Sequence, residues 1–184
     1  MTQKGFDVLN SLITSQQTQF IDFICIGKDS NLEDDCSDKI KKLCEIHSIA
    51  YFFKESLSKK KLNSNFYIAI SWLWLLDFPN LIIIHDSVLP KYRGFAPLVN
   101  MLINGENEIG ATAIFASNEY DKGEIIAQEK IAIQYPITIA EAINAVGNLY
   151  VNLVNQIISQ GVSNSFQPKV QNENEATYSL WLDQ

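Results

Sequence analysis

One histidine and the chain's only arginine fall within a single short stretch, residues 85–94, which read HDSVLPKYRG. His85 directly follows the apolar run at residues 81–84, and such a run is typical of a buried strand. Ligands of open α/β sheets bind at the carboxyl ends of strands, so an imidazole at this position can do proton chemistry or stabilise negative charge. A histidine that only caps the strand is the alternative.

A second polar stretch, YDKGE at residues 120–124, lies between two further apolar runs. The pattern predicts a strand that enters a loop containing Asp121 and Gly123, and then a further strand.

The elements that must position these side chains alternate along the chain. Apolar runs typical of strands occur at residues 20–26, 49–53, 66–72, 81–84, 111–115 and 125–133. Helical patterns lie between several of these runs, and this alternation predicts an α/β fold with a mostly parallel sheet covered by helices.

Three helices can be assigned from their caps and apolar faces. The clearest begins at Thr138, with Glu141 completing a capping box, and ends at Gly161. A short helix is expected over residues 95–103. A third is expected to be capped by Asn31, with its packing face formed by Leu32, Cys36, Ile40, Leu43 and Cys44.

Length and composition favour a single domain over residues 1–184, since 184 residues with 47% apolar content support one core. Residues 162–184 are polar and lack periodicity, so we expect an extended C-terminal tail, anchored by Tyr178 and Trp181. The formal net charge of -7 and the single arginine argue against a nucleic-acid partner.

The three cysteines are odd in number and show no CxxC spacing, which favours reduced thiols in a cytoplasmic protein. No signal peptide or membrane-spanning run is visible, so we expect a soluble chain with no membrane partner. Zinc spacings, a P-loop and a GxGxxG motif are all absent from the sequence, and no metal is expected.

Taken in order, the motifs HDSVLPKYRG, NGE, GAT and YDKGEIIAQ resemble those of the N10-formyltetrahydrofolate-dependent formyltransferases. The form HDS-x-LPKYRGFAP is most similar to that of the nucleotide-sugar amine N-formyltransferases. The resemblance implies a Rossmann-like, mostly parallel sheet with helices on both faces, as in the formyltransferase catalytic domain. It also implies formyl transfer from N10-formyltetrahydrofolate to an amino group, with a nucleotide-linked amino sugar as the expected acceptor.

The same resemblance implies two catalytic residues. His85, as an imidazolium, would stabilise the oxyanion that forms when an amine attacks the formyl carbon, and Asp121 would orient His85 and help to remove the amine proton. The family pattern has an asparagine where this chain has Ile83, and isoleucine cannot donate a hydrogen bond. Ser87, Asn100 and Asn118 are the candidate substitutes for the missing donor.

The resemblance places the folate pocket in three stretches and in the loop after the histidine. The implied residues are Trp72, Trp74, Leu75, Leu76, Leu81, Ile83, Val88, Leu89, Ser117, Asn118 and Tyr120. For Trp72 a purely structural role in the core is equally expected.

Arg93 can hold a substrate phosphate or, as we favour, stiffen its loop by pairing with a carboxylate such as Asp86. The family's first strand has no counterpart, because the first helix begins about Lys4, and the chain stops before full-length members do. We therefore keep two alternatives, a shortened or impaired homologue that binds folate or sugar nucleotide without turnover, and a methionyl-tRNA formyltransferase-like protein. A homo-oligomer that fills the gap in the sheet is a further expectation.

Overall fold

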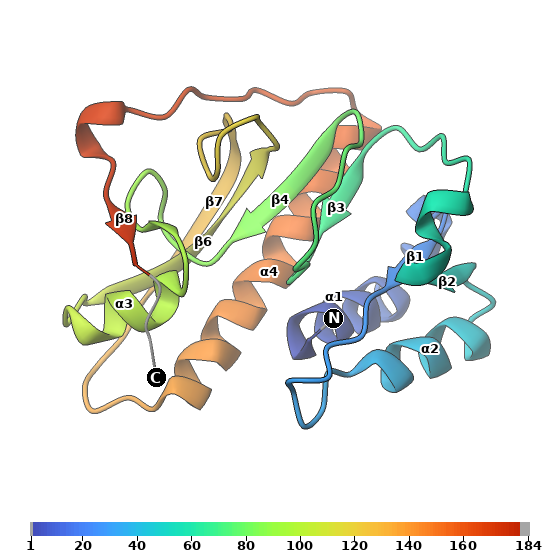
Figure 1. The fold of residues 1–184 in the computed structure, drawn as a ribbon, viewed down its shortest axis with the longest axis horizontal. Helices are drawn as coiled ribbons and strands as arrows, with labels where there is room; N and C mark the ends of the chain where they lie inside the picture. The colour runs from blue at the N-terminus through green and yellow to red at the C-terminus, as the bar shows by residue number, and fades with distance from the viewer. Residues whose placement is uncertain (1, 181–184) are drawn as a thin grey trace. The chain divides into compact units, whose positions relative to one another are not determined.

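The apolar runs of the sequence form short strands, and several of the segments between them contain helices, in a computed structural model that describes residues 2–180 (Figure 1). The chain divides into two units. The N-terminal unit comprises Met1–Asn65 and Ile70–Leu76, and the C-terminal unit comprises Phe66–Ala69 and Asp77–Gln184. The predicted division into one domain with a tail from residue 162 stays a prediction.

The N-terminal unit is built around two parallel strands. Its elements are α1 (Gln3–Thr14), η1 (Thr18–Phe20), β1 (Ile24–Ile26), α2 (Ser37–Ile46), β2 (Tyr51–Phe53) and η2 (Lys54–Lys59). β1 and β2 pair with Ile24 opposite Tyr51. The core consists of buried apolar side chains from α1, β1, α2 and the residues that flank α2, namely Leu9, Ile26, Cys36, Ile40, Cys44 and Ile49.

Helix α2 begins later than the sequence predicts, so the expected Asn31 cap is wrong. The backbone N–H groups of Cys36 and Ser37 donate to the carboxylates of Asp34 and Asp35, 2.8 and 2.9 Å away. These carboxylates satisfy the first free donors of the helix, which an asparagine five residues earlier cannot reach. Ile40 and Cys44 face the core as expected.

The C-terminal unit contains a four-stranded sheet in the order β3, β4, β6, β7. The strands are β3 (Tyr67–Ala69), β4 (Leu81–His85), β6 (Glu108–Phe115) and β7 (Ile125–Ala132). β3 and β4 run parallel, whereas β6 is antiparallel to both β4 and β7. The α/β class is as predicted. The sheet of this unit is mixed, because β4 is parallel to β3 but antiparallel to β6, and the loop between β6 and β7 reverses the chain once more.

Helix α4 (Ile139–Val162) packs against β6 and β7. The predicted capping box is present: the Thr138 hydroxyl accepts from the N–H of Glu141, whose carboxylate accepts from the N–H of Thr138. The Tyr150 hydroxyl of this helix contacts the Ile84 carbonyl at 2.9 Å and Asp86 Oδ1 at 2.6 Å. Asp86 therefore lies on the α4 side of β4. Since side chains alternate along a strand, His85 faces the opposite side.

The chain after α4 returns across the C-terminal unit (Figure 1). Lys169 pairs with Ile125, η3 spans Glu173–Glu175, and β8 (Tyr178–Ser179) runs parallel to the two-residue strand β5 (Arg93–Gly94). Helix α3 (Pro97–Ile103) follows β5, close to its predicted range. Trp181, the second expected anchor, lies outside the described residues. Within residues 2–180, no helix is both long enough and apolar enough for a membrane span.

Candidate functional site

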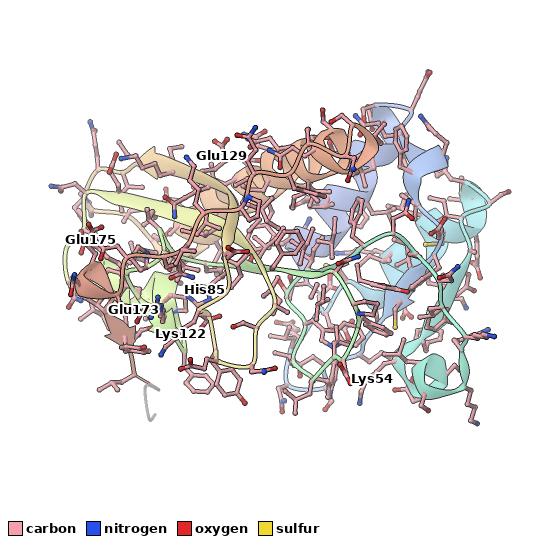
Figure 2. The ribbon with its side chains drawn as sticks, turned by 90° about the horizontal axis from the view of Figure 1, so that it is seen from above. Lys54, His85, Lys122, Glu129, Glu173 and Glu175 are labelled. Atoms are coloured by element: carbon pink, nitrogen blue, oxygen red, sulfur yellow. The ribbon has the colours of Figure 1, made fainter. Side chains whose placement is uncertain are left out.

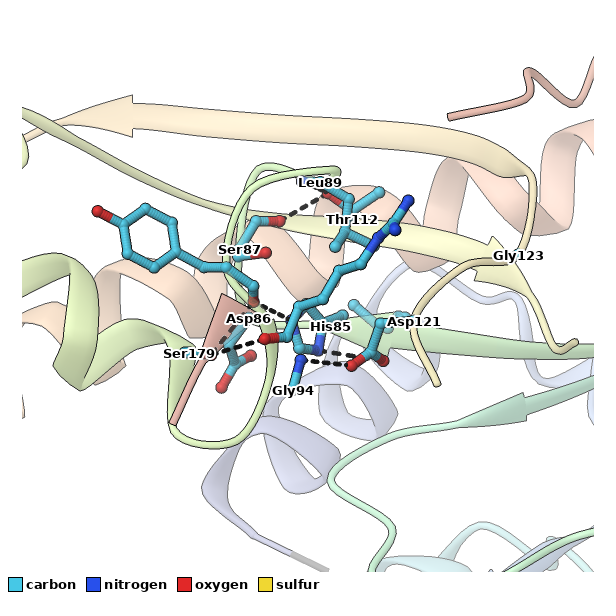
Figure 3. A network of polar contacts seen from close by, with 12 residues as sticks. His85, Asp86, Ser87, Leu89, Gly94, Thr112, Asp121, Gly123 and Ser179 are labelled. Atoms are coloured by element: carbon cyan, nitrogen blue, oxygen red, sulfur yellow. Dashed lines mark hydrogen bonds and ion pairs between the residues drawn. The ribbon is translucent and has the colours of Figure 1, made fainter. Parts of the chain in front are cut away.

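The two residues expected to carry the chemistry meet at the end of β4 (Figure 3). His85 is the last residue of β4, and Asp121 lies in the loop between β6 and β7. Nδ1 of His85 lies 3.5 Å from Oδ1 of Asp121, and the two side chains are only 9% and 16% exposed. The pair is therefore a largely enclosed imidazole and carboxylate contact, although 36 positions separate the two residues in the sequence.

Backbone groups hold the other side of each member of the pair. Nε2 of His85 lies 2.8 Å from the Tyr92 carbonyl, and the Gly94 N–H donates to Asp121 Oδ2 at 2.8 Å. Both backbone groups belong to residues 92–94. These follow residues 86–91, the histidine loop. This short segment therefore fixes the imidazole and the carboxylate together.

The turn at Asp121 has a backbone that few residues tolerate. Asp121 has a φ of 57°, in the left-handed region that aspartate tolerates better than most side chains. A Cβ at Gly123 would collide with the Phe115 carbonyl, so the D-x-G pattern is a steric requirement of the hairpin. Gly94 has a φ of 96°, and a Cβ there would lie 2.8 Å from the Ser179 carbonyl oxygen. Both glycines allow two backbone segments to approach each other closely.

Both ring nitrogens of His85 are engaged within the chain. A carbonyl oxygen can only accept, so Nε2 carries a hydrogen and donates it to Tyr92. Nδ1 faces the Asp121 carboxylate. When His85 is an imidazolium, this carboxylate can accept the second N–H of the ring and stabilise its charge. The arrangement can therefore hold or exchange a proton at Nδ1, and direct donation to a ligand requires one of these two partners to move.

Ile83 precedes His85 by two residues and lies on the same side of β4. This is the position at which the family pattern has its asparagine. Two of the three candidate substitutes already donate elsewhere: the Ser87 hydroxyl to the Lys91 carbonyl at 2.7 Å, and the Asn100 amide to the Ala96 carbonyl at 2.9 Å. Asn118 is exposed in the loop that precedes Asp121, and no hydrogen bond of its amide is found within residues 2–180.

Arg93 has a structural role, which was the favoured interpretation, but its carboxylate partner is not the expected Asp86. The guanidinium is 0% exposed, and its five N–H donors reach Gln171, Glu173 and Tyr178. Asp86 instead accepts from Tyr150. Hydrogen bonds and charge of Glu173 raise the pKa of Arg93, and Arg93 in turn lowers the pKa of Glu173 below its ordinary 4.5.

Gln171 and Glu173 were missed by sequence reasoning. They follow the last helix in a polar segment without periodicity, and the burial of the chain's only arginine was the one signal that such partners must exist. Figure 2 labels Glu173, His85 and Lys122. The charge of Lys122 also lowers the pKa of Glu173.

Four of the predicted folate-binding residues, Trp72, Trp74, Leu75 and Leu76, belong to the N-terminal unit. The two indole rings meet edge to face at 5.1 Å, and Lys54 Nζ lies 4.3 Å from the centre of the Trp74 ring. The indole nitrogen of Trp72 is buried and has no hydrogen-bond acceptor among the described residues. Leu75 is 89% exposed. Their role in folate binding stays a prediction.

The other predicted folate-binding residues belong to the C-terminal unit. Leu81 and Leu89 are buried, Ile83 and Val88 are half-buried, and Ser117, Asn118 and Tyr120 are exposed in the hairpin loop. Val88 and Leu89 also line a cleft of about 320 Å³. The remaining lining residues are mostly polar or charged: Pro90, Lys91, Tyr92, Met101, Glu106, Glu108, Gln128, Lys130 and Glu175.

A polar network fixes the histidine loop that forms one wall of this cleft. The buried Thr112 hydroxyl donates to the Ser87 carbonyl at 2.6 Å and accepts from the Leu89 N–H at 3.1 Å. Gln128 donates to the Leu89 carbonyl at 2.9 Å, and Tyr92 donates to Glu106 at 2.5 Å. Burial and Glu106 both raise the pKa of Tyr92. Within the described part of the chain, no group of three histidine, cysteine or carboxylate side chains is arranged to hold a metal.

Comparison with known protein families gives a match to the formyl transferase family over residues 69–158. This range includes His85, Arg93 and Asp121. Among curated relatives, a methionyl-tRNA formyltransferase from Hydrogenobaculum sp. (strain Y04AAS1) is 39% identical over 97 residues, which are 53% of this chain and 32% of that protein. The chain spans between 32% and 50% of the length of the first curated relatives that it matches.

Comparison with solved structures gives the same fold. A sugar 3N-formyl transferase, WlaRD, solved in the presence of dTDP and 5-N-formyl-THF, superposes with a TM-score of 0.77 at 18% identity, covering 96% of this chain and 65% of its own. Phosphoribosylglycinamide formyltransferase from Bacillus halodurans superposes with a TM-score of 0.67 at 15% identity, covering 86% and 91%. These likenesses confirm the predicted formyltransferase-type α/β fold.

Proposed function

We propose that this chain, whose residues 69–158 belong to the formyl transferase family, transfers a formyl group from N10-formyltetrahydrofolate to an amino group of a small substrate. The observation that carries the proposal is the pairing of His85 with Asp121 at 3.5 Å at the end of β4. Strand β4 and the β6–β7 hairpin loop bring together the two groups that acyl transfer to an amine requires, a cation for the oxyanion and a base for the proton.

In the proposed reaction the amine nitrogen attacks the formyl carbon, and the electron pair of the C=O bond moves to oxygen. The attacking nitrogen loses its proton to Asp121, whose Oδ1 faces His85. The oxyanion then re-forms the carbonyl and expels N10 of the folate, which takes up a proton. A formamide and tetrahydrofolate result. His85, with its charge held between the Tyr92 carbonyl and Asp121, stabilises the oxyanion.

The oxyanion also needs a donor that replaces the asparagine of the family pattern. We assign this role to the Asn118 amide, because Ser87 and Asn100 already donate within the chain. The loss of one such donor typically costs roughly 100- to 1,000-fold in rate. Asn118→Ala is expected to lower kcat within that range, whereas Asn118→Gln retains part of it. Single-turnover formyl transfer measures the effect.

A nucleotide-linked amino sugar is the acceptor that we favour. Its support is the net charge of -7, the likeness to a sugar 3N-formyl transferase, and the cleft beside the histidine loop. Lys91 at the rim of this cleft is exposed, and no carboxylate partner of it is found in the described part of the chain. An ammonium group there can meet a diphosphate. Lys91→Ala is therefore expected to raise KM for the acceptor and leave kcat unchanged.

The decisive experiment is a formyl-transfer assay with N10-formyltetrahydrofolate and a panel of amino-sugar nucleotides, with mass spectrometry of the formamide product. His85→Ala and Asp121→Asn should each lower kcat/KM by roughly 100- to 10,000-fold, the usual contribution of acid–base groups. Asp86→Asn is the matched control, because Asp86 lies beside His85 but faces Tyr150 on the other side of the strand. Full activity in the His85 variant would exclude the proposed mechanism.

Methionyl-tRNA is the second candidate acceptor, and the 39% identity over 97 residues to a methionyl-tRNA formyltransferase favours it. Charged initiator tRNA belongs in the same panel. Formylation of tRNA that weakens steeply with salt would favour this candidate over the sugar.

An impaired homologue is the remaining alternative, motivated by Ile83. It predicts folate binding without turnover. Tetrahydrofolate would then raise Tm at saturating concentration while no acceptor in the panel is formylated.

A further inference from the structure

The segment after the last helix is attached to the site at both of its ends. Near its start, Lys169 and Ile125 exchange two backbone hydrogen bonds of 2.8 and 2.9 Å. Near its end, the Thr177 carbonyl accepts from the Arg93 N–H at 2.9 Å, and β8 pairs with β5. Gln171 lies between these two attachments and is buried.

All four hydrogen-bonding positions of the Gln171 amide are used. Its Oε1 accepts from Nε and Nη2 of Arg93 at 3.1 and 2.8 Å. Its Nε2 donates to the carbonyls of Asp121 and Gly123, at 2.8 Å each. Since a guanidinium only donates, Arg93 must face the amide oxygen, and the amide N–H groups must point at the turn.

These two donations act on the peptide groups that follow Asp121 and Gly123 in the turn. Asp121 is in the left-handed region, so its backbone needs support from its surroundings. When both carbonyls are held, the direction in which the Asp121 side chain leaves the backbone is fixed. That direction sets the 3.5 Å separation between its carboxylate and His85.

We propose that Gln171 is a positioning residue for formyl transfer, which orients the Asp121 carboxylate toward His85 by holding the two carbonyls of its turn, with Arg93 fixing the orientation of the amide. This inference rests on the proposed function. It makes formyl transfer depend on Gln171, which lies 50 residues after Asp121 in a segment with no recognisable motif.

The variant Gln171→Glu removes the two hydrogen bonds that Gln171 donates to the turn. The new carboxylate still accepts from Arg93, but it has no N–H for the turn, and its charge repels the two carbonyls. We expect kcat to fall by up to about 100-fold, the cost of a small misplacement of a catalytic group, with KM for the folate donor unchanged. Gln167→Glu is the matched control, the same change at an exposed position of the same segment, and should retain full activity.

Two further variants separate orientation from general loosening. Glu173→Gln weakens the attachment of the segment through Arg93 but leaves the Gln171 amide intact, and it should retain most of kcat. Gln171→Glu in an Asp121→Asn background should add no further loss, because both act through the same carboxylate. An equal loss in Glu173→Gln, or full additivity in the double variant, would overturn the inference. If Gln171→Glu shows no cooperative thermal transition, Gln171→Asn replaces it and should lower kcat in the same direction.

A spectroscopic readout keeps the test independent of turnover. The NMR signals of the His85 ring nitrogens should shift in Gln171→Glu in the same direction as in Asp121→Asn, and should stay unchanged in Gln167→Glu. A wild-type chain that transfers no formyl group refutes the proposed function, while these shifts still decide the role of Gln171. Unchanged His85 signals in Gln171→Glu would refute that role.

Discussion

The two units of the chain bury polar side chains to different extents. In the N-terminal unit the core is apolar, from Leu9 on α1 to Ile40 and Cys44 on α2, and the buried polar residues among those described are Lys4 and Ser37. The C-terminal unit also has an apolar core, but beside it this unit buries His85, Arg93 and a set of hydroxyl and amide groups, namely Ser87, Thr112, Gln171 and Ser179. Buried polar groups need partners with defined geometry, whereas apolar groups need only volume.

The difference shows which unit carries the buried polar network of the candidate site. Thr112, Gln171 and Ser179 each form hydrogen bonds with residues 85–94 or with the turn at Asp121. The N-terminal unit should therefore respond to changes in volume, and the C-terminal unit to changes in hydrogen-bonding pattern. Four experiments test this contrast.

The largest effect is expected from a cavity in the apolar core. Ile40→Ala should lower the free energy of unfolding by about 2–5 kcal/mol, because Ile40 is fully buried. Ile46→Ala, on the same helix but 62% exposed, is the matched control and should cost little. Urea denaturation measures both. Equal costs would contradict the core described for this unit.

The cysteines of the N-terminal unit should be unreactive in the folded state. Burial is the main cause that raises the pKa of Cys25 and of Cys44 from 9.0 to about 11. A thiol with a pKa of about 11 instead of 9.0 has a thiolate fraction about 100-fold lower near pH 8, and alkylation should slow by a similar factor. Mass spectrometry after timed iodoacetamide treatment, with and without urea, measures this ratio. Equal rates in both conditions would show that the thiols are not protected.

Removal of the buried guanidinium should destabilise the C-terminal unit through hydrogen bonding rather than volume. Arg93→Met leaves Oε1 of Gln171 buried without a donor, which should cost about 1–3 kcal/mol. Arg93→Lys should restore only part of the loss, since an ammonium cannot reproduce five donors. Lys130→Met is the control, because both members of its ion pair with Glu108 are exposed. A stable Arg93→Met variant would contradict the role of the network.

The smallest effect is a weak dependence of stability on acid. The pKa of Glu173 is lowered in the folded chain, so its carboxylate stabilises the fold at pH values above about 4.5. This contribution is lost as the pH falls through the lower folded value. The protection factors of the Gly94 and Ser179 amides, which compare hydrogen exchange with the intrinsic rate at each pH, should therefore fall between pH 6 and pH 3. Glu173→Gln should remove this dependence, and an identical profile in the variant would refute it.

Local sequence patterns predicted most of the fold. The capping box at Thr138 and Glu141 starts α4 as expected, and the apolar runs form strands near the predicted positions. The Asn31 cap is wrong because Asp34 and Asp35 offer closer acceptors to the first N–H groups of α2. Several side chains within a few residues can cap the same helix. The sequence pattern alone does not rank acceptors that lie so close together.

At the candidate site, the sequence motifs and their order predict the pairing of His85 with Asp121. They do not predict the groups that hold this pair in place. The Tyr92 carbonyl and the Gly94 N–H are backbone groups, which no side-chain pattern reports. Gln171 reaches the turn from 50 positions away through a segment without periodicity. Contacts of this kind arise only when the chain is folded, and sequence reasoning could signal them only through the need of a buried arginine for partners.

The enclosure of Arg93 also has a consequence for how this chain can recognise anions. With its single guanidinium already saturated inside the protein, the only side-chain cations that remain for a phosphate or carboxylate ligand are lysine ammonium groups and histidine. Ammonium groups are point charges without the planar fork that reads two oxygens at once. Any anionic substrate should therefore be selected mainly by shape and backbone contacts, and its charged end should be held loosely and screened readily by added salt.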